Sequence, residues 1–414
     1  MPAPLTIRAI ESRVLTADNG PRYDQTAGLP SVRDAGARAP ASTGPFPGRD
    51  DRRHICYYPP TRNVVIVKIT AGDGQIGWGE CLTPVAPRVA HTIIEELLAP
   101  MLIGADAREI ELLWERMFST MRLRSHDSGH TTEAMSGIDI ALWDLLGHYR
   151  EEPVWRLLGG AYRRRLPVYA SGVPGQTNEE RLASLEELVQ EKGFSAVKLS
   201  VGNGTYAEQR NTVAAVSAAL GERGRLLVDV HGTFDLADAR RFAAFLEELG
   251  NVEWLEEALL PDDHDAYAEL TASTTIRIAV GETDTHRAMV RERVVRRGCD
   301  VVLPDVCRAA GITGTARMAR LADTFGVAWA SHVSVGTELH NAAGLHIGAA
   351  TPNFLVSEYP YRYAEGPFGL ALTPGMKRPI DGWIDIGEEP GLGVEVSEDG
   401  VDNLTVQRQL TALE

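Results

Sequence analysis

Seven side chains suited to acid–base or metal chemistry end seven successive apolar segments of the sequence. In one of them, LLVDVHG (226–232), an apolar run stops at Asp229, and His231 follows two residues later. Burying a charged group is unfavourable unless the group is paired or bound to a metal. The series therefore indicates a functional site. Its members are Lys198, Asp229, Glu256, Glu282, Asp305, His332 and Glu358.

Three carboxylates in this series, Asp229, Glu256 and Glu282, follow consecutive apolar segments. Carboxylates held together repel one another unless a cation neutralises them. Hard oxygen ligands without cysteine favour Mg²⁺, with Mn²⁺ as a possible substitute. In the segment WLEEA, side-chain alternation along a strand lets only one of Glu256 and Glu257 point inward.

Asp305 and His332 end the next two segments. A carboxylate beside an imidazole orients the ring and stabilises its protonated form, which makes a suitable general base. The alternative for His332 is a histidine that only satisfies its hydrogen bonds in the core.

The elements that must position these side chains begin near residue 165. Eight short β-branched segments alternate there with helical stretches, which predicts right-handed crossovers and a parallel sheet. Eight repeats favour a closed (β/α)₈ barrel, whose strand ends form one ring around the active-site mouth. An open doubly wound sheet would need a glycine-rich fingerprint after its first strand, and GVPGQTNEE (172–180) is not one.

The preceding part of the chain predicts an α+β capping domain. A strand at 5–16 and a hairpin formed by 63–70 and 75–82 come first, and helices at 88–125 and 131–150 follow. The Gly- and Pro-rich loop 17–53 is either a mobile lid or plain disorder. The predicted domain limits are 1–135 for the cap, 136–375 for the barrel and 376–414 for a C-terminal segment that returns to the cap.

Composition and charge restrict the classes of binding partner and the cellular location that we expect. The net charge of −16 disfavours nucleic acid and anionic membranes as partners, and no apolar run is long enough for a transmembrane helix. The four cysteines lack CxxC spacing and the N-terminal residues lack a secretion signal, so we expect reduced thiols and a cytoplasmic location.

The whole pattern resembles the enolase superfamily, mandelate racemase subgroup, including the segments GIDIALWDLLG (137–147) and PGLGVEV (390–396). The resemblance implies that Mg²⁺ binds Asp229, Glu256 and Glu282, and that His332 with Asp305 is the base. It further implies that Glu358 helps to hold the substrate carboxylate or enolate. The shared chemistry is proton abstraction next to a carboxylate, and family members are commonly multimers, so a homo-oligomer is expected.

One departure from the racemase pattern reduces the number of reactions that the resemblance allows. Racemases of this kind carry a second lysine where VKLSVG has Ser200, so one of the two proton relays is absent. The Asp-x-His of DVHG instead resembles sugar-acid dehydratases, chiefly galactonate dehydratases, in which the histidine protonates the leaving hydroxyl. His231 would then be the acid, unless it only orients a metal ligand.

These features predict a Mg²⁺-dependent dehydratase that converts a sugar acid, an aldonate similar to galactonate, to a 2-keto-3-deoxy acid. Lys198 would supply the local positive charge that an anionic substrate needs. The alternatives are a sugar-lactone cycloisomerase, a racemase or epimerase of the same superfamily, and a barrel protein without catalytic activity.

Overall fold

The computed structural model describes residues 5–18, 61–202 and 205–413. The loop 17–53, predicted as a lid or as disorder, lies almost wholly outside the described residues.

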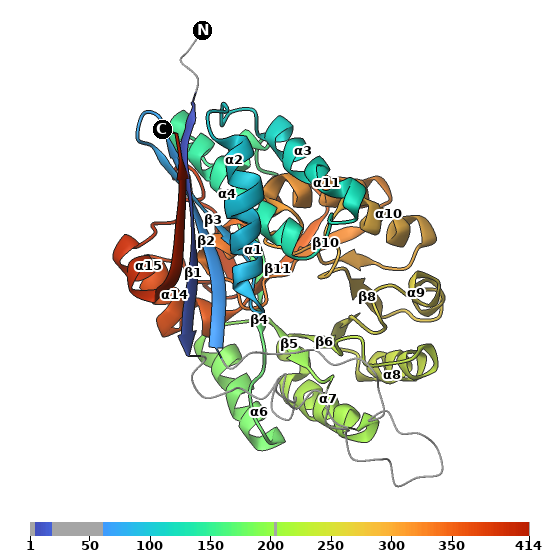
Figure 1. Cartoon of the computed structure of the whole chain (residues 1–414). Coiled ribbons are helices and arrows are strands. Elements are labelled where there is room, and N and C mark those ends of the chain that lie inside the picture. The colour runs from blue at the N-terminus through green and yellow to red at the C-terminus, as the bar shows by residue number, and fades with distance from the viewer. Residues whose placement is uncertain (1–4, 19–60, 203–204, 414) are drawn as a thin grey trace.

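A four-stranded antiparallel sheet forms the capping domain (Figure 1). The strand order is β13-β1-β2-β3, so the C-terminal strand pairs with the N-terminal one. Gly74, with φ of 88°, provides the left-handed turn between β2 and β3. The strands are β1 (Ile7–Asp18), β2 (Thr61–Ala71), β3 (Ile76–Cys81) and β13 (Thr405–Ala412).

Helices cover the sheet on the side of the barrel (Figure 1). α4 (His130–Arg150) packs on β2 and β3 and also contacts α11 of the barrel. The other elements of the cap are α1 (Pro87–Ile93), a π-helical turn (Ile94–Leu98), α2 (Ala99–Leu102), α3 (Ile110–Thr120) and a 3₁₀ turn (Arg122–Arg124), and α5 (Val154–Leu157) leads into the barrel.

Glycines let α4 approach β3 closely. A Cβ atom on Gly79 would lie 2.0 Å from the carbonyl oxygen of Gly137, and one on Gly77 would lie 2.1 Å from that of Ala141. Both carbonyls belong to α4, whose helical backbone cannot shift locally without losing hydrogen bonds.

The second sheet closes into a barrel of eight parallel strands, because β11 pairs with β4. The expected fold class, a (β/α)₈ barrel with an α+β cap, is confirmed. The strands are β4 (Arg165–Ser171), β5 (Ala196–Ser200), β6 (Arg225–Asp229), β7 (Val252–Glu256), β8 (Arg277–Val280), β9 (Val301–Val302), β10 (Ala328–Ser331) and β11 (Phe354–Tyr359), while β12 (Trp383–Asp385) pairs antiparallel with β4.

Helices connect these strands and form the outer layer of the barrel (Figure 1). They are α6 (Asn178–Glu186) with a π turn (Glu187–Glu191), α7 (Tyr206–Leu220) with a 3₁₀ turn (Gly221–Arg223), α8 (Leu236–Leu249), α9 (His264–Thr271), α10 (Arg287–Arg296), α11 (Gly311–Thr324), α12 (Glu338–Ala349), α13 (Tyr361–Ala364) and α14 (Pro367–Leu372); α15 (Glu398–Leu404) precedes β13.

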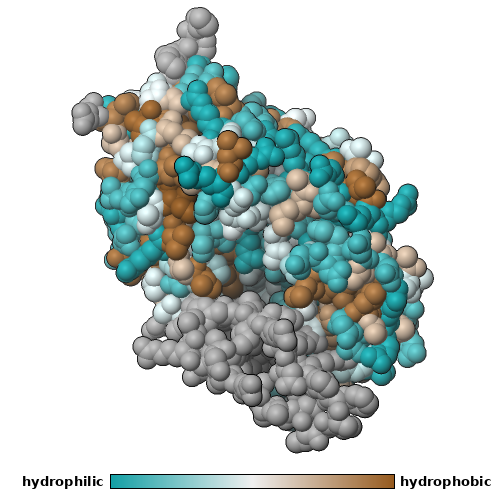
Figure 2. All heavy atoms as spheres, turned by 45° about the vertical axis from the view of Figure 1, so that its right-hand side comes forward, coloured by the Kyte–Doolittle hydropathy of each residue, from teal (hydrophilic) through white to brown (hydrophobic). Residues whose placement is uncertain are grey.

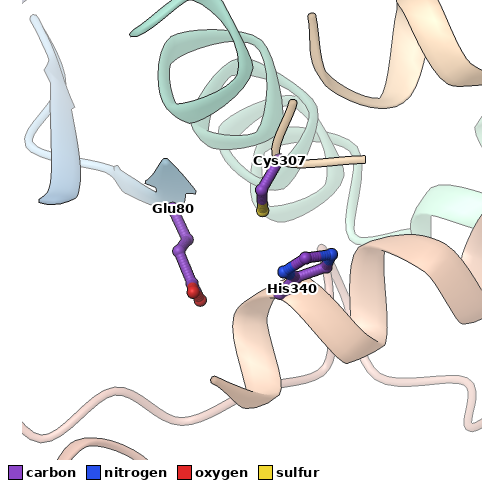
Figure 3. Close-up of side chains that lie close together, drawn as sticks. All are labelled: Glu80, Cys307 and His340. Carbon is purple, nitrogen blue, oxygen red and sulfur yellow. The ribbon is translucent and has the colours of Figure 1, made fainter. Parts of the chain in front are cut away.

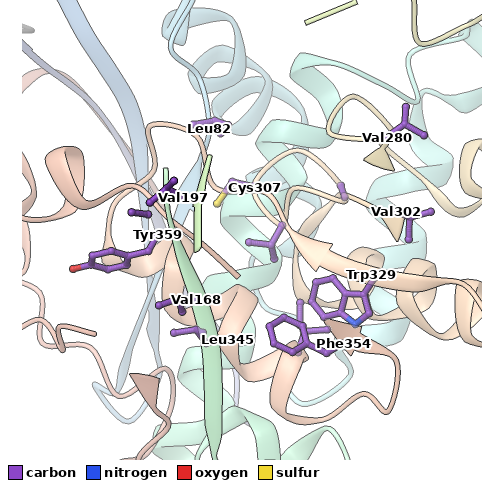
Figure 4. Packing of buried hydrophobic residues seen from close by; sticks show 14 of the residues in the cluster. Leu82, Val168, Val197, Val280, Val302, Cys307, Trp329, Leu345, Phe354 and Tyr359 are labelled. Carbon is purple, nitrogen blue, oxygen red and sulfur yellow. The ribbon is translucent and has the colours of Figure 1, made fainter. Parts of the chain in front are cut away.

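Side-chain alternation along the strands separates two apolar layers. Leu226 and Val228 belong to the large cluster between the strands and the outer helices, whereas Leu227 belongs to a small cluster inside the barrel. Figure 4 shows part of the outer layer, where the rings of Trp329 and Phe354 pack edge to face with centroids 5.1 Å apart.

Polar contacts fasten the cap to the barrel. The buried carboxylate of Asp139 on α4 accepts hydrogen bonds from the backbone N–H and the hydroxyl of Thr313 on α11. Trp114 on α3 donates its indole N–H to the carbonyl of Ala310. The mouth of the barrel therefore lies beside a rigidly docked domain.

The structure can be compared with the predicted domain ranges and with the expectation that the chain has no transmembrane helix. α4 (His130–Arg150) crosses the predicted limit at 135/136, and the three predicted domain ranges stay predictions. The face in Figure 2 mixes hydrophilic and hydrophobic side chains. Among the described residues, no helix is both long and apolar enough to span a membrane.

We predict that Gly79→Ala lowers the free energy of unfolding by about 3 kcal/mol, because the new methyl group meets helix backbone that cannot yield. Denaturant unfolding measures the change. Gly72→Ala is the control, because the nearest atom to its Cβ would be 3.8 Å away. Equal stability of the two variants would contradict the close packing of α4 on β3.

Candidate active site

All seven residues of the series lie at the carboxyl ends of the barrel strands. Lys198 and Glu358 lie within β5 and β11, and Asp229 and Glu256 are the last residues of β6 and β7. The remaining three follow the next strands within three residues: Glu282 after β8, Asp305 after β9 and His332 after β10. Closure of the barrel therefore brings residues that are far apart in the sequence to one mouth.

The side chains of Asp229, Glu256 and Glu282 converge. One carboxylate oxygen from each lies within 4.8 Å of the others. Glu256 faces inward with Trp254, whose indole N–H donates to its Oε2 at 2.9 Å. The alternation that allowed only one inward glutamate therefore selects Glu256.

Glu257 points elsewhere and supports the site from behind. Its Oε1 accepts hydrogen bonds from the backbone N–H groups of Gly281 at 2.7 Å and Glu282 at 3.3 Å. Burial, and then the nearby charge of Glu282, raise its pKa to about 8. Glu257 therefore holds the backbone of a candidate metal ligand and is largely uncharged at neutral pH.

Lys198 is the buried cation of the mouth. Its Nζ lies 2.8 Å from Glu256 Oε1, 2.9 Å from Glu358 Oε1 and 3.9 Å from Asp229 Oδ2. Burial opposes its charge, but Glu256 and Glu358 raise its pKa well above the ordinary value. The lysine is therefore charged.

The donor set fits a hard divalent cation. Five carboxylates surround the mouth, those of Asp229, Glu256, Glu282, Asp305 and Glu358, and their buried cationic partner is Lys198, with histidines beside it. Burial raises the pKa of Glu256 to about 7, and the charges of Asp229 and Glu358 add to that rise against the effect of Lys198. A dication bound to three oxygen ligands would relieve this excess of negative charge.

His332 contacts both Asp305 and the carboxylate cluster. Its Nδ1 lies 2.7 Å from Asp305 Oδ2, and its Nε2 lies 3.1 Å from Glu282 Oε2. Burial disfavours the imidazolium, but Glu282, Glu358 and Asp305 together raise the pKa of His332 well above its ordinary value. Asp305 thus orients the ring with Nε2 toward the mouth.

Glu358 is held from four sides. Its Oε1 accepts from the Ser171 hydroxyl and from Lys198, and its Oε2 accepts the backbone N–H groups of Val333 at 2.6 Å and Ser334 at 3.0 Å. Burial would raise its pKa, but Lys198 and His332 lower it below the ordinary range. Its carboxylate is ionised and ties β11 to the loop after β10.

His231 reaches the cluster by a route that alternation did not predict. Alternation along an extended strand would place His231 on the same side as Asp229. This expectation of extended backbone is wrong, because the strand ends at Asp229 and His231 has φ of 48°. The turn still brings its Nδ1 to 3.3 Å from Asp229 Oδ1, and the side chain stays about one-third exposed. Its position is compatible both with an acid and with an orienting residue.

Sequence reasoning missed one member of this network. His340 lies in the first turn of α12, and its Nε2 lies 3.2 Å from Asp305 Oδ1, on the side of the carboxylate away from His332. Nothing in the spacing of ELHNAAG indicates this contact, because α12 and the loop after β9 meet only in the folded barrel.

Two arginines that the sequence did not single out, Arg62 and Arg308, contact elements of the barrel mouth. Arg62 donates to the carbonyls of Val335 and Gly336, and its guanidinium carbon lies over the rings of Tyr363 and Phe368, 4.7 and 4.4 Å from their centroids. It thereby fixes the loop after β10. Arg308 Nη1 lies 3.9 Å from Glu282 Oε1, at the edge of the mouth.

Comparison with known proteins agrees with this architecture. Residues 59–159 match the family described as mandelate racemase / muconate lactonizing enzyme, N-terminal domain, and residues 180–400 match the enolase C-terminal domain-like family. The chain is 32% identical to D-galactarolactone cycloisomerase of Agrobacterium fabrum over 81% of this chain and 90% of that protein.

Two further relatives carry related names. D-xylonate dehydratase of Haloferax volcanii is 31% identical over 82% of this chain and 84% of that protein. The crystal structure of 3,6-anhydro-D-galactonate cycloisomerase from Zobellia galactanivorans superposes with a TM-score of 0.81 at 28% identity, covering 97% of this chain and all of that one. The relatives thus include both dehydratases and cycloisomerases.

We predict that Glu256→Gln abolishes Mg²⁺ binding, because it removes one of three charged oxygen ligands. Isothermal titration of the metal-free protein with Mg²⁺ measures this. Glu257→Gln is the matched control, since Glu257 is already largely uncharged and its amide oxygen can still accept from Gly281. Loss of Mg²⁺ binding in Glu257→Gln alone would reverse the assignment.

Proposed function

Because the chain belongs to the mandelate racemase and muconate lactonizing enzyme branch of the enolase superfamily, we propose that it dehydrates a sugar acid. The substrate class is an aldonate similar to galactonate, and the product is a 2-keto-3-deoxy acid. The observation that carries the proposal is that two histidines contact different carboxylates of one cluster: His332 lies against Glu282, and His231 lies against Asp229.

Asp229, Glu256 and Glu282 would hold Mg²⁺. When bound, Mg²⁺ would supply positive charge to the substrate carboxylate and so acidify the adjacent C–H. The family typically uses this ion. Without it, the protein's own cations offset only part of the charge at the mouth.

In this proposal His332 removes the C2 proton from its neutral form, which a cation bound at Glu282 would favour by offsetting the negative charge that raises the pKa of His332. Asp305 binds Nδ1, so Nε2 is the nitrogen that receives the proton. Lys198, buried beside Glu256 and Glu358, adds a fixed positive charge where negative charge develops on the substrate. Glu358 positions Lys198 and the loop after β10, and would lie near the substrate carboxylate.

His231 protonates the C3 hydroxyl as it leaves. Hydroxide is a poor leaving group, so a dehydratase needs an acid at this point. Nδ1 of His231 faces Asp229, which leaves Nε2 to donate the proton. The enol that results takes up a proton and becomes the 2-keto-3-deoxy acid.

A sugar-lactone cycloisomerase is the second candidate, favoured by the 32% identity to the Agrobacterium enzyme. It would use the same proton abstraction but expel a ring oxygen. A lactone ring oxygen leaves as a carboxylate, which needs no strong acid. The importance of His231 therefore separates the two reactions. A screen of aldonic acids, aldaric acids and their lactones, with detection of 2-keto product, tests both.

We predict that His332→Asn stops both C2 hydrogen exchange with solvent and product formation, because the base is gone. His231→Asn should keep proton abstraction but slow dehydration by roughly 10²–10⁴-fold, the range typical of general acid catalysis. Deuterium exchange at C2 of unreacted substrate, followed by NMR in D₂O, distinguishes these effects.

Metal titration is the control for the histidine variants, since a lost ion would mimic a lost acid. Dehydration by His231→Asn at the wild-type rate would refute the acid role. Full recovery of that variant at high Mg²⁺ would make His231 a support for Asp229 only.

We also predict that the enzyme does not epimerise its substrate at C2. Ser200 stands where a second base would be needed, and a serine hydroxyl is too weak a base to replace it. NMR of recovered substrate checks this, and appearance of the C2 epimer would count against a one-base site.

A further inference from the structure

A second cluster of potential ligands lies where the cap meets the barrel. It consists of Glu80 at the end of β3, Cys307 in the loop after β9 and His340 in the first turn of α12. All three side chains are fully buried. Figure 3 shows that they come from three separate segments and point toward a common space.

The chemistry of this cluster differs from that of the mouth. A carboxylate oxygen, a thiol sulfur and an imidazole nitrogen lie within 4.8 Å of one another. Thiolate and imidazole ligands favour Zn²⁺ and similar borderline-soft cations over Mg²⁺. Around such an ion, ligand atoms are about 3.5 Å apart, so the side chains need to close by about 1 Å.

His340 provides the independent observation. Its Nε2 is engaged with Asp305 and with the carbonyl of His332, whereas its buried Nδ1 has no hydrogen-bond partner among the described residues. A buried polar nitrogen without a hydrogen-bond partner is unfavourable. Because Nε2 is occupied, Nδ1 is the nitrogen that can serve as a ligand.

Glu80 has capacity left for a metal. Within the described part of the chain, its two oxygens accept hydrogen bonds from the backbone N–H and the hydroxyl of Thr337, and a carboxylate offers about four lone-pair positions. Charge balance is also favourable. One carboxylate and one thiolate neutralise a dication, so the filled site adds no net charge to the interior.

We propose that Glu80, Cys307 and His340 form a structural site for Zn²⁺ or a similar divalent cation, with a water molecule as fourth ligand. Binding replaces the proton of the Cys307 thiol, which is released to solvent. The ion joins β3 of the cap to two segments of the barrel. Ligation through Nδ1 also leaves a proton on Nε2 of His340, which donates to Asp305.

Co²⁺ is the probe, because a cobalt–thiolate bond gives a charge-transfer band in the near ultraviolet that oxygen ligands do not. The metal-free full chain, with Mg²⁺ in excess to fill the oxygen site, is titrated with Co²⁺ and then with Zn²⁺. The expected result is one Co²⁺ bound with this band, displacement by Zn²⁺, and a higher Tm with either ion.

Cys307→Ser should abolish the band, whereas Cys299→Ser and Cys56→Ser should keep it. Cys299 is also buried but lies outside the cluster. Glu80→Gln keeps the thiol and should weaken Co²⁺ binding by at least about tenfold, which tests the site if Cys307→Ser does not fold.

Absence of the band in the folded parent chain would overturn the proposal and leave the cluster as a set of metal-free side chains. A band that survives Cys307→Ser, or an unchanged affinity in Glu80→Gln, would overturn it as well. None of these outcomes depends on the sugar-acid activity, so the two proposals fail separately.

Discussion

The contact of one buried lysine with two buried glutamates is the interaction on which the rest of the mouth depends. Lys198 lies within 2.9 Å of both Glu256 and Glu358, which come from opposite parts of the barrel sequence. Removing one partner of a buried ion pair typically costs about 3–5 kcal/mol, because the other charge is left without compensation. The ammonium therefore permits a concentration of carboxylates that would otherwise repel, and holds β5, β7 and β11 in a fixed relation at their carboxyl ends.

Side-chain alternation makes this concentration possible without weakening the fold. Leu226 and Val228 pack outward against the helices, while the residues between and after them, Leu227 and Asp229, face inward. The apolar contacts that stabilise the barrel are thus on the opposite face of the same strands. Polar residues enter only at the strand ends, where the barrel opens.

Asp305 links this mouth to the cap. One oxygen binds His332 on the side of the mouth, and the other faces His340 and the backbone N–H of Cys307. His340 in turn lies beside Glu80 of β3. The orientation of the candidate base therefore depends on residues of both domains, which the contacts of Asp139 and Trp114 with the barrel hold together.

The sequence by itself determined the order of the elements and most of the candidate site. Period-two alternation and the recurrence of polar residues after apolar segments are local properties, so they predicted the eight strands and placed the seven residues of the mouth at their ends. The tertiary structure alone decided which groups touch. Closure of the barrel placed Lys198 against both Glu256 and Glu358, and a left-handed residue ended the extended backbone at His231. The contact of His340 with Asp305 and the position of Arg62 under the loop after β10 had no signal in the sequence. Such contacts join segments that are distant along the chain, and their geometry is set by barrel closure and cap docking rather than by the residues next to them.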